Sequence, residues 1–289
     1  MEVIKTIKKI RYIVKKLKQN KKSIGFVPTM GALHSGHISL IKKARKENDI
    51  VVVSIFVNPI QFGPNEDYLR YPRPLNQDLK ICKYQNVDIV FNPEIKEMYG
   101  RNHLTYVKVE KISDILCGKF RKGHFKGVAT VVAKLFNIVQ PDRAYFGLKD
   151  YQQLKIIQKM VDDLNFDIKI IPCQIIREKN GLAMSSRNTY LNEQERNYAS
   201  RIYCGLVKAK DFIKKNLKIK KIIPVMDVVR LIRNELKEIP DIRIEYIKLC
   251  ESAELNEIKK ISSEISELVI LVALWIGKTR LIDNIEIKL

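Results

Sequence analysis

Residues Pro28 to His37 read Pro-Thr-Met-Gly-Ala-Leu-His-Ser-Gly-His, and this stretch decides the interpretation of the chain. It follows a short apolar run at 24–27 and precedes an amphipathic segment at 38–45. A strand, a glycine-bearing turn and a helix in this order are typical of a parallel α/β domain. The unpaired backbone N–H groups and positive dipole end of a helix start favour an anion, above all a phosphate. The stretch therefore predicts a phosphate-binding turn.

Two histidines and two glycines give this turn its chemical character. His34 and His37 are three residues apart, so both can reach one ligand from one helical turn. Gly31 and Gly36 lack side chains where a ligand would approach the backbone closely. The motif alone also fits two capping or half-buried histidines without a chemical role, and both interpretations stay open at this point.

Length and composition bound the class of protein. With 289 residues, 46% of them hydrophobic, the chain can form one large and one smaller domain with well-packed cores. The longest apolar run, at 268–276, is too short to span a bilayer, and the N-terminus has no signal-peptide pattern. Five scattered cysteines without a CxxC pair predict neither a disulfide framework nor a zinc site. We expect a cytoplasmic protein with no membrane partner.

The net charge of +21 has two explanations. A nucleic-acid-binding module would use lysine and arginine to neutralise phosphates. Alternatively, the lysines lie on solvated helix faces. Basic residues run along the whole chain and are not grouped with aromatic residues in a stacking motif. This pattern argues against a nucleic-acid partner. A nucleic-acid-binding module nevertheless remains the alternative to an enzyme.

The order of predicted elements gives the fold class. Strands alternate with helices up to about residue 176, which predicts a doubly wound, parallel-sheet (Rossmann-like, HUP-type) α/β domain at 1–178. A smaller α+β domain is expected at 179–289, with a hinge loop at 179–191. The predicted helices are 3–18, 39–47, 75–84, 125–139, 151–163, 193–217 and 225–236. The predicted strands are 24–27, 50–57, 87–91, 143–146, 166–171, 243–249, 268–276 and 280–287, the last two joined as a hairpin at Gly277-Lys278.

Polar groups that follow the second and later strands form two further candidate sites. Asn58 and Gln61 leave the second strand and can hold a small polar substrate, although capping amides in a turn are the alternative. At the start of a later helix, Lys149 would oppose phosphate charge, Asp150 could hold a ribose or a metal-bound water, and Gln153 would face a substrate. An exposed lysine and an N-terminal aspartate are otherwise ordinary helix-start residues.

A third candidate site lies in the loop between the predicted domains. Ser185, Ser186 and Arg187 combine two hydroxyls with a guanidinium, which suits a clamp on a leaving pyrophosphate. A hinge loop capped by serines is the alternative.

The four segments together resemble one family. PTMGALHSGH, FVNPIQFGPNEDYLRYPR, GHFKGVATVVAKLFNIVQPDRAYFGLKDYQQL and GLAMSSRNTYL are similar to the pantoate–β-alanine ligases, members of the HxGH nucleotidyltransferase group. The resemblance covers essentially the whole chain, but the C-terminal domain matches mainly in length and pattern. It implies that ATP activates pantoate to pantoyl adenylate with release of pyrophosphate. The amine of β-alanine then displaces AMP and forms pantothenate, on the route to coenzyme A. The resemblance also implies that Mg²⁺ assists at the phosphates and that the enzyme would be a homodimer.

The resemblance also implies roles for single residues. His37 would be the proton donor, and His34, Lys149 and Arg187 would act with it. Gln61 and Gln153 would bind pantoate, and Gln61 also β-alanine, whereas the metal ligands stay open. Another HxGH nucleotidyltransferase, the alternative within enzymes, would lack these paired amides. The implied ATP contacts are Met30, Gly31, Ala32, Leu33, His34, Ser35, Gly36, His37, Gly147, Leu148, Lys149, Asp150, Ile176, Met184, Ser185, Ser186 and Arg187.

Overall fold

The computed structural model describes residues 1–64 and 66–289. Asn65, within the predicted FVNPIQFGPNEDYLRYPR motif, lies outside the described residues. The chain divides into two compact units. Unit 1 comprises Met1–Leu148 and Gln153–Gln174, and unit 2 comprises Lys149–Gln152 and Ile175–Leu289.

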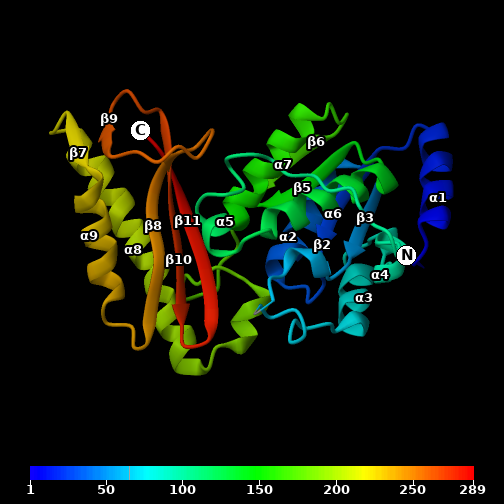
Figure 1. Cartoon of the computed structure of the whole chain (residues 1–289), viewed down its shortest axis with the longest axis horizontal. Coiled ribbons are helices and arrows are strands. Elements are labelled where there is room, and N and C mark those ends of the chain that lie inside the picture. Colours follow the sequence, from blue (N-terminus) through cyan, green and yellow to red (C-terminus); the bar gives the residue numbers. More distant parts are fainter. Residues whose placement is uncertain (65) are drawn as a thin grey trace. The chain divides into compact units, whose positions relative to one another are not determined.

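Unit 1 is built on a six-stranded parallel sheet with the order β1-β4-β3-β2-β5-β6 (Figure 1). Its strands are β1 (Glu2–Ile4), β2 (Ile24–Thr29), β3 (Ile50–Ile55), β4 (Ile89–Phe91), β5 (Arg143–Gly147) and β6 (Lys169–Cys173). The direction of winding reverses between β2 and β5, and ligands of such sheets bind outside the carboxyl ends of the strands at this point. The predicted doubly wound parallel sheet is confirmed, and the PTMGALHSGH segment leaves β2 at this switch point.

Helices cover both faces of this sheet because neighbouring residues of a buried strand point in opposite directions. On β2, Val27 packs in one cluster with Leu40 and Ile41 of α2. The adjacent Phe26 meets Phe136 of α6 edge-on, with ring centroids 6.4 Å apart. The helices from this part of the chain are α1 (Ile7–Gln19), α2 (Ser35–Glu47), η1 (Pro59–Gln61), α3 (Leu75–Tyr84), α4 (Ile95–Met98), α5 (Cys117–Phe120), α6 (His124–Val139), η2 (Leu148–Asp150) and α7 (Tyr151–Asp163).

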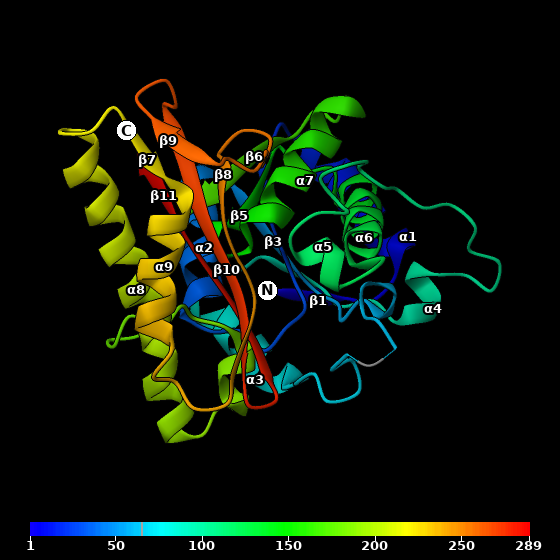
Figure 2. The same ribbon diagram turned by 60° about the vertical axis from the view of Figure 1, so that its left-hand side comes forward.

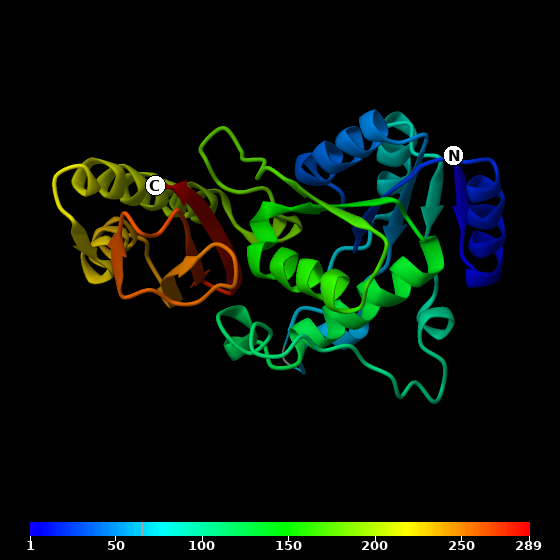
Figure 3. The same ribbon diagram turned by 90° about the horizontal axis from the view of Figure 1, so that it is seen from above.

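The N-terminus differs from the sequence prediction. The helix predicted from Val3 begins at Ile7 instead, capped by Thr6, whose side chain accepts the Lys9 N–H. Residues 2–4 form the edge strand β1, which pairs in parallel with β4 (the end marked N in Figure 3). This strand depends on a partner more than 80 residues away along the chain, so local periodicity could not reveal it.

Unit 2 contains a three-stranded antiparallel sheet with the order β11-β10-β8. The helices α8 (Glu193–Leu217) and α9 (Val225–Leu236) pack on it and enclose the core of this unit (Figure 2). The predicted hairpin is confirmed, because Ile276 pairs with Thr279 across Gly277-Lys278. The remaining elements are η3 (Ser186–Tyr190), β7 (Ile222–Pro224), β8 (Ile242–Glu251), β9 (Lys260–Ser262), β10 (Glu267–Ile276) and β11 (Thr279–Lys288).

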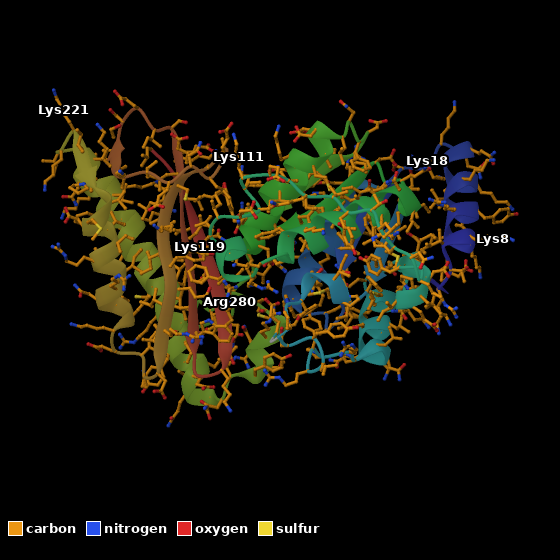
Figure 4. The ribbon with its side chains drawn as sticks, in the orientation of Figure 1. Lys8, Lys18, Lys111, Lys119, Lys221 and Arg280 are labelled. Carbon is orange, nitrogen blue, oxygen red and sulfur yellow. The ribbon has the colours of Figure 1, made fainter. Side chains whose placement is uncertain are left out.

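Basic side chains are exposed on both units. Lys8 and Lys18 extend from α1 in unit 1, and Lys221 lies before β7 in unit 2 (Figure 4). Positive charge is therefore carried by both units, in agreement with its spread along the sequence. Within the residues that the structure describes, no helix is long and apolar enough to cross a membrane.

Candidate active site

A buried carboxylate holds the turn that follows β2. Asp78 of α3, which is 1% exposed, accepts the Ala32 N–H on Oδ2 at 2.9 Å and the Leu33 N–H on Oδ1 at 2.8 Å. Gly31 and Ala32 both have positive φ, +80° and +49°. A Cβ atom at Gly31 would lie 2.9 Å from Asp78 Oδ2, so the turn requires glycine there. The close neighbour that this glycine accommodates is the protein's own carboxylate.

This arrangement changes the expected role of the turn. Burial raises the pKa of Asp78 above its usual 3.8, although the hydrogen bonds from Leu33 and Ala32 act in the opposite direction. The sequence predicts that amides of this turn face a phosphate, but the Ala32 and Leu33 amides are taken by Asp78. Asp78 thus engages two amides that precede α2, and the phosphate contacts of this turn stay a prediction.

The two histidines are oriented by backbone amides at the start of α2. Nδ1 of His34 accepts the Gly36 N–H at 3.1 Å, and Nδ1 of His37 accepts the His34 N–H at 3.3 Å. An imidazole nitrogen that accepts a hydrogen bond carries no proton, so each neutral ring holds its proton on Nε2. The ring centroids are only 4.1 Å apart. The structure thus brings both predicted histidines together with Nε2 as the donor nitrogen of each, which suits phosphate oxygens.

Gln61 is fixed through a chain of amide hydrogen bonds. Tyr99 donates its hydroxyl to Asn58 Oδ1 at 2.7 Å, and burial raises the pKa of this tyrosine. Asn58 Nδ2 then donates to Gln61 Oε1 and to the Gly127 carbonyl, both at 3.1 Å. The Gln61 NH₂ group is left directed to Met30 Sδ, 3.0 Å away. The predicted substrate amide therefore contacts a residue of the predicted ATP turn.

The backbone of Gln61 is held from α6. A Cβ atom at Gly127 would lie 2.5 Å from the Ile60 carbonyl oxygen, so glycine permits the close approach of this helix. His124 Nδ1 donates to the Gln61 carbonyl at 2.8 Å, because a carbonyl can only accept. Its Nε2 then accepts from Arg121, which also donates to both carboxylate oxygens of Glu66. The sequence analysis assigned no role to His124, although it stands at the start of a matched segment.

The remaining predicted residues of unit 1 are placed by β5 and α7. Gly147 is the last residue of β5, and Leu148 follows it directly. Gln153 is half-buried in the first turn of α7. Within the part of unit 1 that the structure describes, no hydrogen bond joins Gln153 to Gln61.

Lys149 and Asp150 belong to unit 2. The Lys149 side chain is 19% exposed, and its Nζ lies 4.0 Å from Asp150 Oδ1. The Lys149 carbonyl accepts a hydrogen bond from Asn284 Nδ2 at 2.9 Å. The main chain at Lys149 is therefore fixed by β11, a strand in which the sequence analysis identified no site residue.

The other predicted ATP contacts of unit 2 lie in and after a short antiparallel turn. The Met184 N–H donates to the Ile176 carbonyl at 2.9 Å, and Arg177 forms a β-bridge with Ala183. This pairing places Ile176 and Met184 side by side. Ser185 caps η3, because its hydroxyl accepts the Arg187 N–H at 3.3 Å.

A buried amide braces this segment. Asn188, which is 3% exposed, donates from Nδ2 to the Ala183 carbonyl at 3.1 Å and to Glu178 Oε1 at 2.9 Å. Glu178 also accepts two hydrogen bonds from Arg196, and these lower the pKa of its carboxyl group. The segment that carries Ser185, Ser186 and Arg187 is therefore tied to itself and to α8.

Buried thiols near the parallel sheet are unsuited to nucleophilic attack. Burial raises the pKa of Cys82 to about 12, with a further contribution from the charge of Asp78. Burial also raises the pKa of Cys173 to about 11. Both thiols stay protonated near neutral pH, and the thiolate is the reactive form. The geometry supports binding and charge stabilisation rather than a covalent enzyme intermediate through these thiols.

The structure first defines a class. A parallel sheet that changes winding direction beside a histidine-bearing turn, together with a smaller α+β unit, is a Rossmann-like α/β enzyme architecture. The family model for pantoate–β-alanine ligase matches residues 2–286. The chain therefore belongs to the pantoate–β-alanine ligase family, whose reaction joins pantoate to β-alanine.

Pantothenate synthetases from other organisms are similar in sequence to nearly the whole of this chain. The pantothenate synthetase of Thermosipho africanus (strain TCF52B) is 50% identical over 290 residues, covering 99% of this chain and 100% of the relative. That of Endomicrobium trichonymphae is 51% identical over 286 residues, covering 99% and 97%.

Solved structures show the same fold. The crystal structure of pantothenate synthetase from Thermus thermophilus has a TM-score of 0.91 at 39% identity, with 99% of both chains covered. The pantoate–β-alanine ligase from Francisella tularensis, complexed with β-γ ATP and β-alanine, has a TM-score of 0.77 at 39% identity, covering 99% and 97%.

Proposed function

We propose that this ligase works in two steps on ATP, pantoate and β-alanine. A carboxylate oxygen of pantoate attacks the α-phosphorus of ATP, and the bond to pyrophosphate breaks. The β-alanine amine then attacks the acyl carbon of pantoyl adenylate, loses a proton and expels AMP. One observation carries the proposal: paired Nε2 donors on His34 and His37 stand on the turn whose Met30 contacts the Gln61 amide.

Unit 1 supplies the groups at the reacting centre in this proposal. His37 donates a proton or hydrogen bond to the phosphates from Nε2, and His34 acts beside it. Gln61 and Gln153 hold pantoate, and Gln61 also contacts β-alanine. Because Asn58 fixes which end of Gln61 is NH₂, this amide is oriented before substrate arrives. Such positioning accelerates a reaction whose chemistry needs no enzyme nucleophile.

Unit 2 supplies charge for the leaving group. Lys149 and Arg187 oppose the negative charge of the phosphates, and Ser185 and Ser186 add hydroxyl donors. Asp150 contacts the nucleotide beside Lys149. The bracing by Asn188 supports this role, since a held loop loses less conformational freedom when it binds phosphate. The remaining proposed ATP contacts are Gly31, Ala32, Leu33, Ser35, Gly36, Gly147, Leu148, Ile176 and Met184.

Mg²⁺ enters this proposal as part of the nucleotide substrate. Among residues 1–64 and 66–289, no group of three or more His, Cys, Asp or Glu side chains could hold a metal ion. Mg²⁺ is commonly carried by substrate phosphates and water with few protein ligands. The residues present therefore fit MgATP rather than a dedicated protein cage, and the ion would neutralise phosphate charge.

Two further proposals concern the state of the protein. We propose a homodimer, as the resemblance implies. The apolar C-terminal strands give no separate support, because they fill the core of unit 2. Light scattering after size exclusion tests it, and a monomeric mass would refute it. We also propose a cytoplasmic location, with support from the buried thiols Cys82, Cys173 and Cys250.

The decisive experiment uses the purified chain with ATP, Mg²⁺, pantoate and β-alanine. Mass detection should find pantothenate and AMP in equal amounts. Without β-alanine, pyrophosphate should appear in an amount close to that of the enzyme, because the adenylate stays bound. Pyrophosphate release that does not depend on pantoate would instead indicate another nucleotidyltransferase activity.

A further inference from the structure

Two adjacent polar residues of β11 are almost fully buried. Asp283 is 4% exposed and Asn284 is 3% exposed. They lie a few residues after Arg280, which is labelled near the start of this strand in Figure 4 and pairs with Glu245. Buried polar side chains are costly unless they are hydrogen-bonded, so their partners reveal what they do.

Asp283 holds the short antiparallel turn that carries two of the proposed ATP contacts. Its Oδ2 and Oδ1 accept from Arg177 Nη1 and Nη2 at 2.6 and 3.0 Å, a two-point ion pair. The same guanidinium donates to the Gly181 carbonyl at 3.1 Å and lies 3.6 Å from the centre of the Tyr203 ring. Arg177 is thus fixed on several sides, and it lies within the segment that pairs Ile176 with Met184.

Asn284 holds the other segment. Its Nδ2 donates to the Lys149 carbonyl at 2.9 Å, while its own N–H donates to Asp283 Oδ1 at 2.8 Å. Two residues further along β11, Glu286 accepts from the Tyr151 hydroxyl at 2.9 Å. Alternate residues of one strand therefore bind the segment around Lys149 at two points. These contacts explain why Lys149–Gln152 belongs to unit 2, although both sequence neighbours belong to unit 1.

We propose that Asp283 and Asn284 form a positioning pair for adenylate formation. Asn284 sets the main chain of Lys149, and Asp283 sets the Arg177 turn, so one strand fixes the spacing between the two phosphate-contact segments of unit 2. Neither residue needs to touch the substrate. The inference rests on the proposed role of Lys149 at the nucleotide. Small displacements of a charge from its working position are enough to lower a rate substantially.

The test separates the two half-reactions. In the variant Asn284→Leu the side chain keeps the branching at Cγ but loses its donor, so the Lys149 carbonyl is left without that partner. We expect the rate of adenylate formation to fall about 10-fold or more. This rate is measured as the release of pyrophosphate in a single turnover. The reaction of presynthesised pantoyl adenylate with β-alanine should stay within about threefold of wild type, because pyrophosphate has already left. A role in folding alone would lower both half-reactions together.

Thr279→Val is the matched control. Thr279 is also a buried polar residue of β11, at 4% exposed, but it lies at the hairpin end of the strand. This variant should change both half-reactions equally and little. If Asn284→Leu loses no more adenylate formation than Thr279→Val, or loses both half-reactions equally, the positioning role is refuted. Asn284→Asp provides the same test should the leucine variant not fold, since it keeps the shape and removes the NH₂ donor.

Lys149→Ala distinguishes this inference from the proposed function. If Lys149→Ala retains wild-type adenylate formation, the role of Lys149 itself fails, and the positioning inference falls with it. If Lys149→Ala is crippled while Asn284→Leu and Asn284→Asp both match the control, only the positioning inference fails. If all three lose adenylate formation selectively, both are supported.

Discussion

The main chains of the turn after β2 and of the loop before η3 are held in place by different kinds of contact. The turn with His34 and His37 is held from outside, by Asp78, which lies 45 residues beyond Leu33 in the chain. The loop is held mainly from within, because Asn188 binds the carbonyl of Ala183 only five residues earlier. The turn is therefore a product of tertiary packing, whereas the loop is largely a local structure. This difference fits our proposal that the turn carries the groups at the reacting centre, where a fixed position matters most.

The two bracing carboxylates also differ in their electrostatics. Asp78 is buried and accepts the backbone N–H groups of Ala32 and Leu33, and burial raises its pKa. Glu178 is paired with Arg196, which lowers its pKa. Burial therefore disfavours the charged form of Asp78, whereas the ion pair with Arg196 favours the charged form of Glu178.

The largest expected effect tests the chemical part of this comparison. His37→Ala removes an Nε2 donor from the phosphates, and loss of a charge-assisted contact costs about 1.5–3 kcal/mol, or about 10–200-fold in rate. Pyrophosphate release should fall by this factor while the unfolding temperature stays close to wild type. Lys42→Ala, an exposed residue of the same helix, is the control and should be neutral. Near-normal release by His37→Ala would exclude the proposed role of this histidine.

The next effect tests whether the turn depends on its buried carboxylate. Asp78→Asn leaves one oxygen to accept two amides, so one buried N–H loses its partner, at a cost of about 1–3 kcal/mol. We expect lower stability in urea and about tenfold slower adenylate formation. Asp88→Asn is the control, because Asp88 accepts the Val51 N–H in the same sheet and its ion pair is with Arg45 in the last turn of α2, at the opposite end of that helix from His37. An equal loss of activity in both variants would contradict the dependence of the turn on Asp78.

A smaller effect is expected in the loop of unit 2. Asn188→Leu removes a neutral hydrogen bond to the Ala183 carbonyl, which contributes about 1 kcal/mol, and one to the Glu178 carboxylate, which contributes about 1.5–3 kcal/mol. Because the charged side chains remain, we expect KM for ATP to rise about threefold with kcat little changed. Asn216→Leu, which removes an amide that binds the Phe212 carbonyl within α8, serves as control. A loss as large as that of Asp78→Asn would show that the loop is as critical as the turn.

The smallest effects concern pH and have opposite signs. The folded-state pKa of Asp78 lies above its usual 3.8, so its stabilising contribution is complete below 3.8 and is lost as pH rises through the raised value. The pKa of Glu178 lies below its usual 4.5, so its contribution is complete above 4.5 and is lost as pH falls through the lowered value.

Urea unfolding between about pH 6 and about pH 3.5 measures both contributions. As pH falls, the stability of wild type relative to Asp78→Asn should increase, and its stability relative to Glu178→Gln should decrease. If both differences move in the same direction, the assigned electrostatic contrast is wrong.

Much of the fold could be predicted because it follows from periodic apolar patterns. The bounds of α3, α7, α8 and α9 match the predicted ranges, and the parallel strands are apolar runs separated by helices. The short elements were missed. β1 and the pair β7–β9 need partners that are distant in sequence, and three residues are too few for a periodic signal. The domain boundary near residue 178 stays a prediction.

The candidate site was predictable where residues gather in one motif. His34, His37 and Gln61 stand out because glycines, strand ends and helix starts mark them in the sequence. Asp78, Asn188 and Asn284 do not, because each is a single polar residue in an ordinary helix, loop or strand. Only their burial and their hydrogen bonds distinguish them from solvated residues of the same type.

The sequence by itself determined the family and the parallel sheet and indicated the groups that we propose to meet a nucleotide, because these depend on local patterns of apolar, glycine and polar residues. The tertiary structure decided how those groups are held. It assigned two of the turn's amides to Asp78 and tied the main chain of Lys149 to β11. These outcomes depend on contacts between residues tens to more than a hundred positions apart, which no local pattern encodes.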